Sequence, residues 1–247
     1  MKPVVFLHGI GGGAKSFAPQ IASFAGAGYQ PIALDLPGYG ERTPVDAMTF
    51  DALAEDVEGT VAQSGLGQPV LVGHSMGGMV VQTLLRRRPE GYAAAVLSCT
   101  SPAFGSPTGD FQKKFMAERL APLDAGKTMA DIAPGAVAGI MGPYADPAGR
   151  ALFVEQYGQV PEATYRAAVK CLVSFDERAN LAAIKVPVLC LGAEHDRQAP
   201  PAMVQKMASK IPNAQYVYFD GLGHMPNLEA PASFDTAILK FLHTALA

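Results

Sequence analysis

A serine between glycines follows directly on a short apolar run. The segment Gly73-His74-Ser75-Met76-Gly77-Gly78 comes after Val70–Val72 and opens a helical stretch, which places Ser75 on a sharp turn between a strand and a helix. Such a turn strains its central residue, and small neighbours two positions to either side, here Gly73 and Gly77, let strand and helix pass closely. The pattern is typical of a nucleophile elbow, and it predicts that the Ser75 hydroxyl attacks a substrate.

A serine hydroxyl is a poor nucleophile at neutral pH, so a base is expected later in the chain. His224 is the best candidate among five histidines, because it lies in a loop after a predicted strand, from which its imidazole can reach Ser75. His74 is adjacent to Ser75 and is expected to point elsewhere. We therefore predict that His224 accepts and returns the proton of Ser75.

The acid that orients this base should lie between the serine and the histidine if the chain order is Ser, Asp or Glu, His. Asp196 meets this condition immediately beyond the predicted strand Val188–Gly192. Glu194 and Asp220 are the remaining candidates, and capping of a following helix is the alternative role for Asp196. Asp196 is the predicted acid.

Acyl transfer also needs hydrogen-bond donors for the negative charge that develops on the substrate oxygen. The backbone N–H of Met76 lies at the start of the helix after Ser75, where the helix dipole favours an anion. The backbone N–H of Ile10, in the glycine-rich turn that begins at His8 and Gly9, can face it from the first strand. We predict an oxyanion hole at Ile10 and Met76, with His8 and Gly9 beside the substrate.

The same turn also fits a dinucleotide-binding pattern. Gly9–Ala14 reads G-x-G-x-x-A after a strand, and Asp35 ends the next predicted strand. That alternative leaves Ser75, Asp196 and His224 unexplained, whereas a hydrolytic interpretation uses the glycines as the oxyanion turn. We therefore expect neither an organic cofactor nor a metal.

Short apolar segments alternate with helical patterns along most of the chain, which is typical of a parallel sheet with helices on both faces. The predicted strands are Val4–Leu7, Ile32–Asp35, Val70–Gly73, Ala94–Cys99, Val188–Gly192 and Tyr216–Phe219. Helices are predicted after an N-cap at Thr49, over Met76 to about Arg88, and around Phe234–Leu242. The predicted fold class is α/β, with a doubly wound, mostly parallel sheet.

Between the fourth and fifth predicted strands the alternation stops. From about residue 103 to residue 184 the sequence has helical patterns and several prolines but no good strand. This segment is too long for a bare loop, so we expect a helical cap over the ends of the strands. The expected organisation is a core of residues 1–102 and 185–247 and a cap of residues 103–184.

The expected cap carries large apolar side chains that either pack against the core or line a substrate pocket. Those that we predict to line the pocket are Met116, Met141 and Phe153. The cap cations that could meet a substrate carboxylate are Arg166, Lys170 and Arg178. Exposure on solvated helix faces is the more ordinary role for such cations.

The composition argues against several kinds of partner and environment. The chain has 247 residues, 49% of them hydrophobic, and a net charge of -3, which does not favour nucleic acid or an anionic membrane surface as a partner. The run Arg86–Arg88 is better explained as cations at a helix C-terminus stopped by Pro89. The opening apolar run Val4–Leu7 is too short for a signal peptide or a membrane span. Three scattered cysteines without metal-ligand spacing indicate a reducing compartment, so we expect a cytoplasmic protein.

Together these segments resemble the α/β-hydrolase superfamily across nearly the whole chain. The similar segments are the turn at His8-Gly9, the loop 35–40, the elbow 73–78, the acid segment 184–200 and the histidine segment 223–231. The resemblance is strongest to serine esterases and enol-lactonases, and it extends to carbon-carbon bond hydrolases and cofactor-free haloperoxidase-like enzymes. Family members usually carry a two-stranded hairpin before the oxyanion strand. Here only Met1-Lys2-Pro3 precede that strand, so we expect about six strands rather than eight.

The expected function is hydrolysis of a small-molecule carboxylic ester or lactone through an acyl-enzyme on Ser75. One alternative is a carbon-carbon bond hydrolase or a haloperoxidase-like enzyme that uses the same triad. An alternative of another class is a sensor that keeps the fold and binds a ligand in the capped pocket without turnover.

Overall fold

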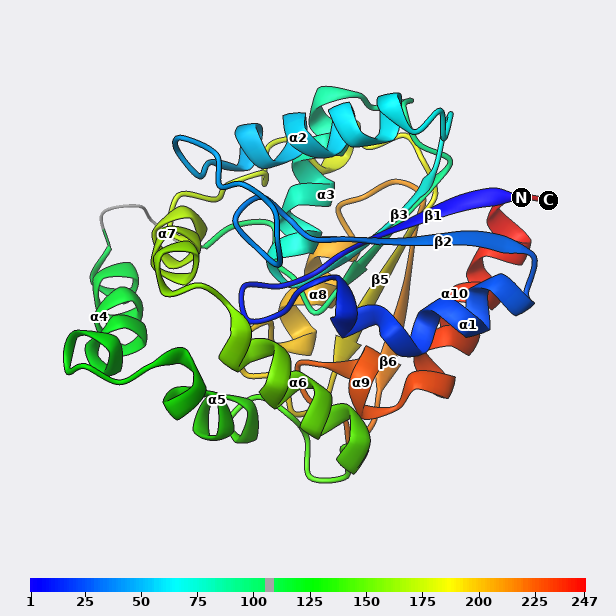
Figure 1. The fold of residues 1–247 in the computed structure, drawn as a ribbon. Helices are drawn as coiled ribbons and strands as arrows, with labels where there is room; N and C mark the ends of the chain where they lie inside the picture. Colours follow the sequence, from blue (N-terminus) through cyan, green and yellow to red (C-terminus); the bar gives the residue numbers. More distant parts are fainter. Residues whose placement is uncertain (105–108) are drawn as a thin grey trace.

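A single parallel sheet organises the molecule (Figure 1). The structure is a computed structural model that describes residues 1–104 and 109–247. Its strands are β1 (Lys2–Leu7), β2 (Tyr29–Leu34), β3 (Val70–His74), β4 (Ala94–Ser98), β5 (Val188–Ala193) and β6 (Ala214–Phe219). They lie in the order β2-β1-β3-β4-β5-β6, and all neighbouring pairs are parallel. The six predicted strands are confirmed, although β2 begins at Tyr29 rather than at Ile32.

The strand order reverses between β1 and β3, which are neighbours in the sheet. The chain builds outward from β1 to β2 on one side and from β3 to β6 on the other. Loops that leave the carboxyl ends of two such strands diverge, and the crevice between them is where open α/β sheets bind ligands. The glycine-rich turn follows β1 and Ser75 follows β3, so this crevice brings the two predicted parts of the site together.

Side chains alternate between two buried apolar clusters, one on each face of the sheet. In β1, Val4 and Phe6 belong to one cluster, whereas Val5 and Leu7 belong to the other. The first face is covered by α1 (Ala18–Gly26) and α10 (Pro231–Ala245), and the second by α2 (Phe50–Gln63), α3 (Met76–Arg87) and α8 (Pro201–Ala208). The sheet is therefore doubly wound, as predicted.

Between β4 and β5 the described residues form four α-helices that continue the larger apolar cluster. They are α4 (Asp110–Asp124), α5 (Met129–Ala138), α6 (Pro147–Gln159) and α7 (Glu162–Leu172). They lie at the end of the sheet where the strands finish, opposite the two chain termini (Figure 1). Residues 105–108 of the segment predicted as a cap lie outside the described residues. An antiparallel bridge between Ala103 and Asp176 joins the two ends of this helical insertion.

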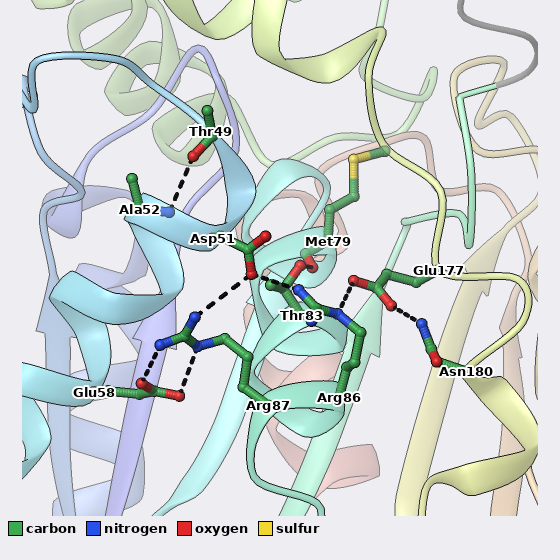
Figure 2. A network of polar contacts seen from close by, with 10 residues as sticks. All are labelled: Thr49, Asp51, Ala52, Glu58, Met79, Thr83, Arg86, Arg87, Glu177 and Asn180. Carbon is green, nitrogen blue, oxygen red and sulfur yellow. Dashed lines mark hydrogen bonds and ion pairs between the residues drawn. The ribbon is translucent and has the colours of Figure 1, made fainter.

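Charged side chains hold the end of α3 against its neighbours (Figure 2). Arg86 contacts Asp51 at 2.5 Å and Glu177 at 2.8 Å, so it links α2, α3 and the segment that returns from the insertion. Arg87 contacts Glu58 of α2 at 2.9 Å. The prediction that these arginines end a helix is confirmed, and α2 begins after Thr49, whose Oγ1 accepts a hydrogen bond from the Ala52 N–H. The pairs fix the helix that carries Ser75 at its other end.

No helix in the described part of the chain is both long enough and apolar enough to cross a membrane. The cysteines are Cys99, Cys171 and Cys190, and all of them are buried free thiols, as predicted. Burial raises the pKa values of the Cys171 and Cys190 thiols to about 12, which keeps these thiols protonated.

Candidate active site

Ser75 occupies a strained turn that its glycine neighbours permit. It is the N-cap of α3 and has φ 53° and ψ -116°, a left-handed backbone that non-glycine residues rarely adopt. A side chain at Gly73 would collide with the Gly77 carbonyl, and one at Gly77 would collide with the carbonyl of Leu7 in β1. The steric argument for an elbow therefore holds in three dimensions.

The end of β4 holds this turn in place. The Ser75 N–H donates to the Ser98 carbonyl at 2.9 Å, and the Thr100 hydroxyl donates to the Ser75 carbonyl at 2.7 Å. Both polar groups of the Ser75 backbone are thus satisfied. Strained backbone of this kind persists where the surroundings determine it, and it clusters at functional sites.

Asp196 and His224 form a buried pair at the ends of β5 and β6. The His224 Nδ1 lies 2.9 Å from Asp196 Oδ2, while Asp196 Oδ1 accepts hydrogen bonds from the N–H groups of Gln198 at 2.8 Å and Ala199 at 3.0 Å. Burial opposes ionisation of Asp196, but attraction to His224 and these hydrogen bonds hold the pKa of its carboxyl below the ordinary value. The geometry suits a carboxylate that orients an imidazole through Nδ1.

The other two acids proposed from the sequence lie elsewhere. Glu194 accepts a hydrogen bond from the Gly221 N–H at 2.7 Å and is exposed, and Asp220 is also exposed. Neither carboxylate contacts the His224 ring among the described residues.

Glu229 anchors the loop that carries His224. Its buried carboxylate accepts hydrogen bonds from the N–H groups of Gly142 and Gly223, each at 2.7 Å, and of Met225 at 2.8 Å. The His224 N–H itself donates to the Ile140 carbonyl at 2.8 Å. Gly142 and Ile140 belong to the connection between α5 and α6, so the insertion takes part in placing the predicted base.

His74 was expected to point elsewhere, and this expectation is wrong. Its ring packs edge-on against the His224 ring, with centroids 4.9 Å apart, and its Nε2–H donates to the His224 carbonyl at 2.7 Å. Burial is the main cause that lowers the pKa of His74 to about 3, and the nearby His224 is the second. A neutral His74 therefore supports the predicted base. The sequence offered no signal for this role beyond adjacency to Ser75.

The two residues predicted to supply the oxyanion hole follow β1 and β3, which are neighbours in the sheet. Ile10 lines the same pocket as Ser75 and His224, and Met76 is the first residue of α3, where helix N–H groups lack intrahelical partners. The Tyr39 hydroxyl donates to the Ile10 carbonyl at 3.2 Å, which fixes the orientation of that residue's backbone. A side chain at Gly9 would come within 3.1 Å of the Ser75 Cβ, so glycine keeps the turn close to the serine.

His8 is held as a neutral imidazole under this turn. Its Nδ1–H donates to the Gly9 carbonyl at 2.8 Å, and its Nε2 accepts from the Leu36 N–H at 3.1 Å. This pair of bonds selects one neutral tautomer, and burial lowers the pKa of His8.

Two pockets meet at Ser75 and His224. The first is lined by His8–Gly12, Ser16, Phe17, His74, Ser75, Arg119, Ile140, Phe153, Tyr157, Gln198, His224, Met225 and Asn227. The second is lined by Ile10, Ser75, Met79, Cys99–Ser101, Phe104, Phe115, Leu172, Gln198, Ala199 and His224. Helices of the insertion contribute to both.

The sequence named three insertion residues for the pocket, and the structure places them differently. Phe153 of α6 lines the first pocket, together with His8 and Gly9. Met116 and Met141 pack in the larger apolar cluster and lie outside the described lining of both pockets. Tyr157, another of the large side chains of the expected cap, also lines the first pocket, and so does Arg119, which the sequence did not single out.

Cys99 lies beside the Asp196–His224 pair. One possible ligand atom from each of these residues lies within 4.8 Å of the others, which is a spacing that a metal ion could use. Burial and the Asp196 carboxylate raise the pKa of the Cys99 thiol well above its ordinary value, and Asp196 Oδ2 already contacts His224. A protonated thiol and an occupied carboxylate fit a hydrogen-bonded cluster better than a metal centre.

The residues of the dinucleotide alternative are used within the protein. Asp35 Oδ1 accepts a hydrogen bond from the Ala14 N–H at 2.6 Å, so a carboxylate occupies the end of the glycine-rich turn. A bound pyrophosphate there would face this negative charge at close range.

Comparison with known proteins agrees with this geometry. The profile of the Alpha/beta hydrolase family matches residues 4–237. The non-heme chloroperoxidase CPO-A1 of Kitasatospora aureofaciens is 28% identical over 236 residues, which cover 90% of this chain and 85% of that protein. A thermophilic esterase from Thermogutta terrifontis superposes with a TM-score of 0.87 at 25% identity, covering 99% of this chain and 90% of the other. An enol-lactonase from Burkholderia xenovorans LB400 shares the fold, with a TM-score of 0.87 at 23% identity over 98% of this chain and 91% of the other.

Proposed function

The chain belongs to the alpha/beta hydrolase family, and within that family we propose that it cleaves a carboxylic ester or lactone through an acyl-enzyme on Ser75. One observation carries the proposal. The buried Asp196–His224 pair, with 2.9 Å between Oδ2 and Nδ1, lies beside a pocket that both Ser75 and His224 line. These are the parts that serine-based acyl transfer requires.

In this mechanism His224 takes the proton of the Ser75 hydroxyl as the serine oxygen attacks the substrate carbonyl. The tetrahedral oxyanion accepts hydrogen bonds from the N–H groups of Ile10 and Met76. His224 then gives its proton to the leaving alcohol oxygen, and the C–O bond breaks to leave an acyl-enzyme. Water, activated by His224, attacks the acyl carbonyl and releases the acid and the free serine. Throughout, Asp196 stays ionised and stabilises the imidazolium.

We propose that the helical insertion acts as a cap that shapes the substrate pocket. Phe153 and Tyr157 of α6, with Phe115 of α4, supply large side chains to the two pockets around Ser75. Pockets of this kind combine an apolar wall with a few polar groups that orient the ligand. The esterase and the enol-lactonase that share the fold support a carboxylic ester or lactone as the substrate class.

A second candidate comes from the relative that is named a non-heme chloroperoxidase, which is 28% identical. A haloperoxidase-like reaction on the same triad would also begin from Ser75 and His224. Assays for halogenation of a phenol by halide and peroxide, run beside the ester assays, distinguish the two activities.

The test is turnover of a panel of aryl esters and lactones by the wild type, Ser75→Ala and Ser64→Ala. Ser64 is an exposed serine at the end of α2, so its variant is the matched control. We expect Ser75→Ala to lose about 10⁵-fold in kcat while Ser64→Ala keeps wild-type activity. Tight binding of a panel member without turnover would instead identify a sensor.

A further inference from the structure

The first pocket contains a cation from the insertion. Arg119 of α4 is half-buried and lines this pocket together with Ser75 and His224. Among the described lining residues no Asp or Glu accompanies it, and no second Lys or Arg does. The histidines His8 and His74 are neutral for the reasons given above. Arg119 therefore makes its side of the pocket around the predicted nucleophile positively charged.

Arg119 has no carboxylate partner within the described ranges 1–104 and 109–247. Residues 105–108 contain no Asp or Glu. By contrast, Arg166 of α7 contacts Asp124 at 2.7 Å and Glu162 at 2.8 Å, and Arg178 contacts Asp176 at 2.5 Å. These two cations, which the sequence suggested for a substrate carboxylate, are neutralised by neighbours outside both pockets.

Lys170 is exposed on α7 and likewise contributes to neither pocket. The cation best placed to meet a charged substrate is thus one that the sequence did not single out.

Aromatic neighbours position the Arg119 side chain. Its guanidinium carbon lies 5.3 Å from the centroid of the Phe115 ring, within the range of a cation–π contact. The Tyr157 hydroxyl forms a hydrogen bond of 2.7 Å with the Tyr165 hydroxyl. Burial raises the pKa of the Tyr157 hydroxyl, whereas the nearby Arg119 lowers it. A guanidinium presents five donors, so these contacts leave N–H groups available.

From this arrangement we propose that Arg119 binds a carboxylate of the substrate, so that the preferred ester or lactone is an anion. The inference rests on the proposed function, because it assigns the substrate class of the same site. A guanidinium and a carboxylate form a bidentate, charge-assisted pair, and the partly desolvated pocket strengthens it.

The second pocket sharpens this assignment. Its described lining includes Met79, Phe104, Phe115 and Leu172 and contains no Lys, Arg, Asp or Glu. Because the two pockets meet at Ser75, one side of the scissile bond is expected to carry the carboxylate and the other to be apolar. Selectivity would therefore combine charge recognition with apolar burial.

The experiment measures kcat/KM for two isosteric pairs of esters. In the first pair, monomethyl adipate and its terminal amide, the charge is on the acyl side. In the second pair, 4-carboxyphenyl acetate and 4-carbamoylphenyl acetate, the charge is on the alcohol side. For the wild type we expect the carboxylate to be preferred at least tenfold in one pair, as about one well-formed charged hydrogen-bond pair would give.

Variants then locate the recognition. Arg119→Gln should reduce the ratio of anionic to neutral kcat/KM about tenfold or more, and Arg119→Lys should retain part of it. Lys113→Gln is the matched control, because Lys113 is an exposed cation on the same helix with 71% of its side chain accessible, and it should leave the ratio unchanged. A wild-type ratio near one in both pairs, or a ratio unaffected by Arg119→Gln, overturns the inference.

Binding of adipate by calorimetry, to the wild type and to Arg119→Gln, gives a measurement that does not depend on turnover. Weaker binding by the variant supports the anion site even if none of the four esters is cleaved, in which case only the proposed function fails. Equal binding by two folded proteins, or no binding by the wild type, contradicts the anion site.

Discussion

The carboxyl edge of the sheet and the helical insertion both reach the pockets around Ser75, but they are built differently. At the sheet edge the side chains are fixed by backbone groups, as where Asp196 accepts two N–H bonds and the Ser75 backbone is held by β4. In the insertion, Arg119 and Phe153 project from helices and are held mainly by side-chain packing. The difference suggests that the sheet determines the reaction and the insertion determines which substrate undergoes it.

The two regions also touch where the insertion supports the loop of the predicted base. The Ile140 carbonyl and the Gly142 N–H, both from the insertion, bond the His224 loop and its anchor Glu229. The side chains that line the pockets can therefore be divided between chemistry and selectivity. The connection between α5 and α6 belongs less clearly to one of the two, because it also supports the His224 loop.

The largest effect within this comparison is expected at the sheet edge. Asp196→Asn should fold normally yet lose about 10³- to 10⁴-fold in kcat on every ester, because a neutral partner neither stabilises the imidazolium nor selects the tautomer. Glu194→Gln is the control and should stay near the wild type, since the exposed Glu194 contacts the Gly221 N–H and the exposed His195. Steady-state kinetics of the two variants measure this difference in kcat. An inactive Glu194→Gln together with an active Asp196→Asn would assign the role of the acid to Glu194 instead.

Glu229→Gln tests the place where the regions touch. A glutamine can present one oxygen and an NH2 group to the three N–H donors, so at least one donor is left facing another donor. We expect a loss of about 2–4 kcal/mol in the free energy of unfolding, measured by urea denaturation. Glu90→Gln removes an exposed ion pair with Lys185 and should change the free energy of unfolding by less than about 1 kcal/mol. Equal losses of stability in the two variants would mean that the Glu229 anchor stabilises the protein no more than an exposed ion pair does.

Selectivity is the prediction for the insertion. Phe153→Ala should change the ratio of kcat/KM between a bulky ester and an acetate ester by about tenfold, because the ring lines the first pocket. Met116→Ala on α4 lies outside the described lining of both pockets, so it should affect stability more than this ratio. If both variants slow every ester equally, the insertion acts through stability alone.

A smaller effect concerns the buried imidazole beside His224. The pKa of His74 falls from 6.5 to about 3 on folding, so between these pH values the unfolded chain binds a proton that the folded protein does not. Stability should therefore fall on acidification below pH 6.5, by at most about 1.4 kcal/mol per pH unit for this group. His74→Gln should reduce that slope, whereas a variant of the exposed His243 should not. Identical slopes for wild type and His74→Gln would exclude the imidazole as its source.

The sequence predicted the sheet edge well and the insertion poorly, for a physical reason. Parallel strands buried on both faces appear in the sequence as short apolar runs. The loops after β3, β5 and β6 carry the polar residues that we propose act there. Ser75, Asp196 and His224 could thus be named from their places in the chain. Helices α4 and α6 gather few buried residues on one face, so the pattern did not separate Phe153, which lines the first pocket, from Met116, which does not. It also gave no sign that Arg119 turns toward that pocket.

The most direct test of the central claim is covalent labelling of the wild-type protein with a fluorophosphonate, followed by intact-mass measurement and peptide mapping. Only a serine activated by a neighbouring base reacts readily with such a reagent. We predict a single adduct on Ser75, strongly slowed in Asp196→Asn. Labelling of a different serine, or turnover of esters by a protein whose Ser75 remains unlabelled, would contradict the account.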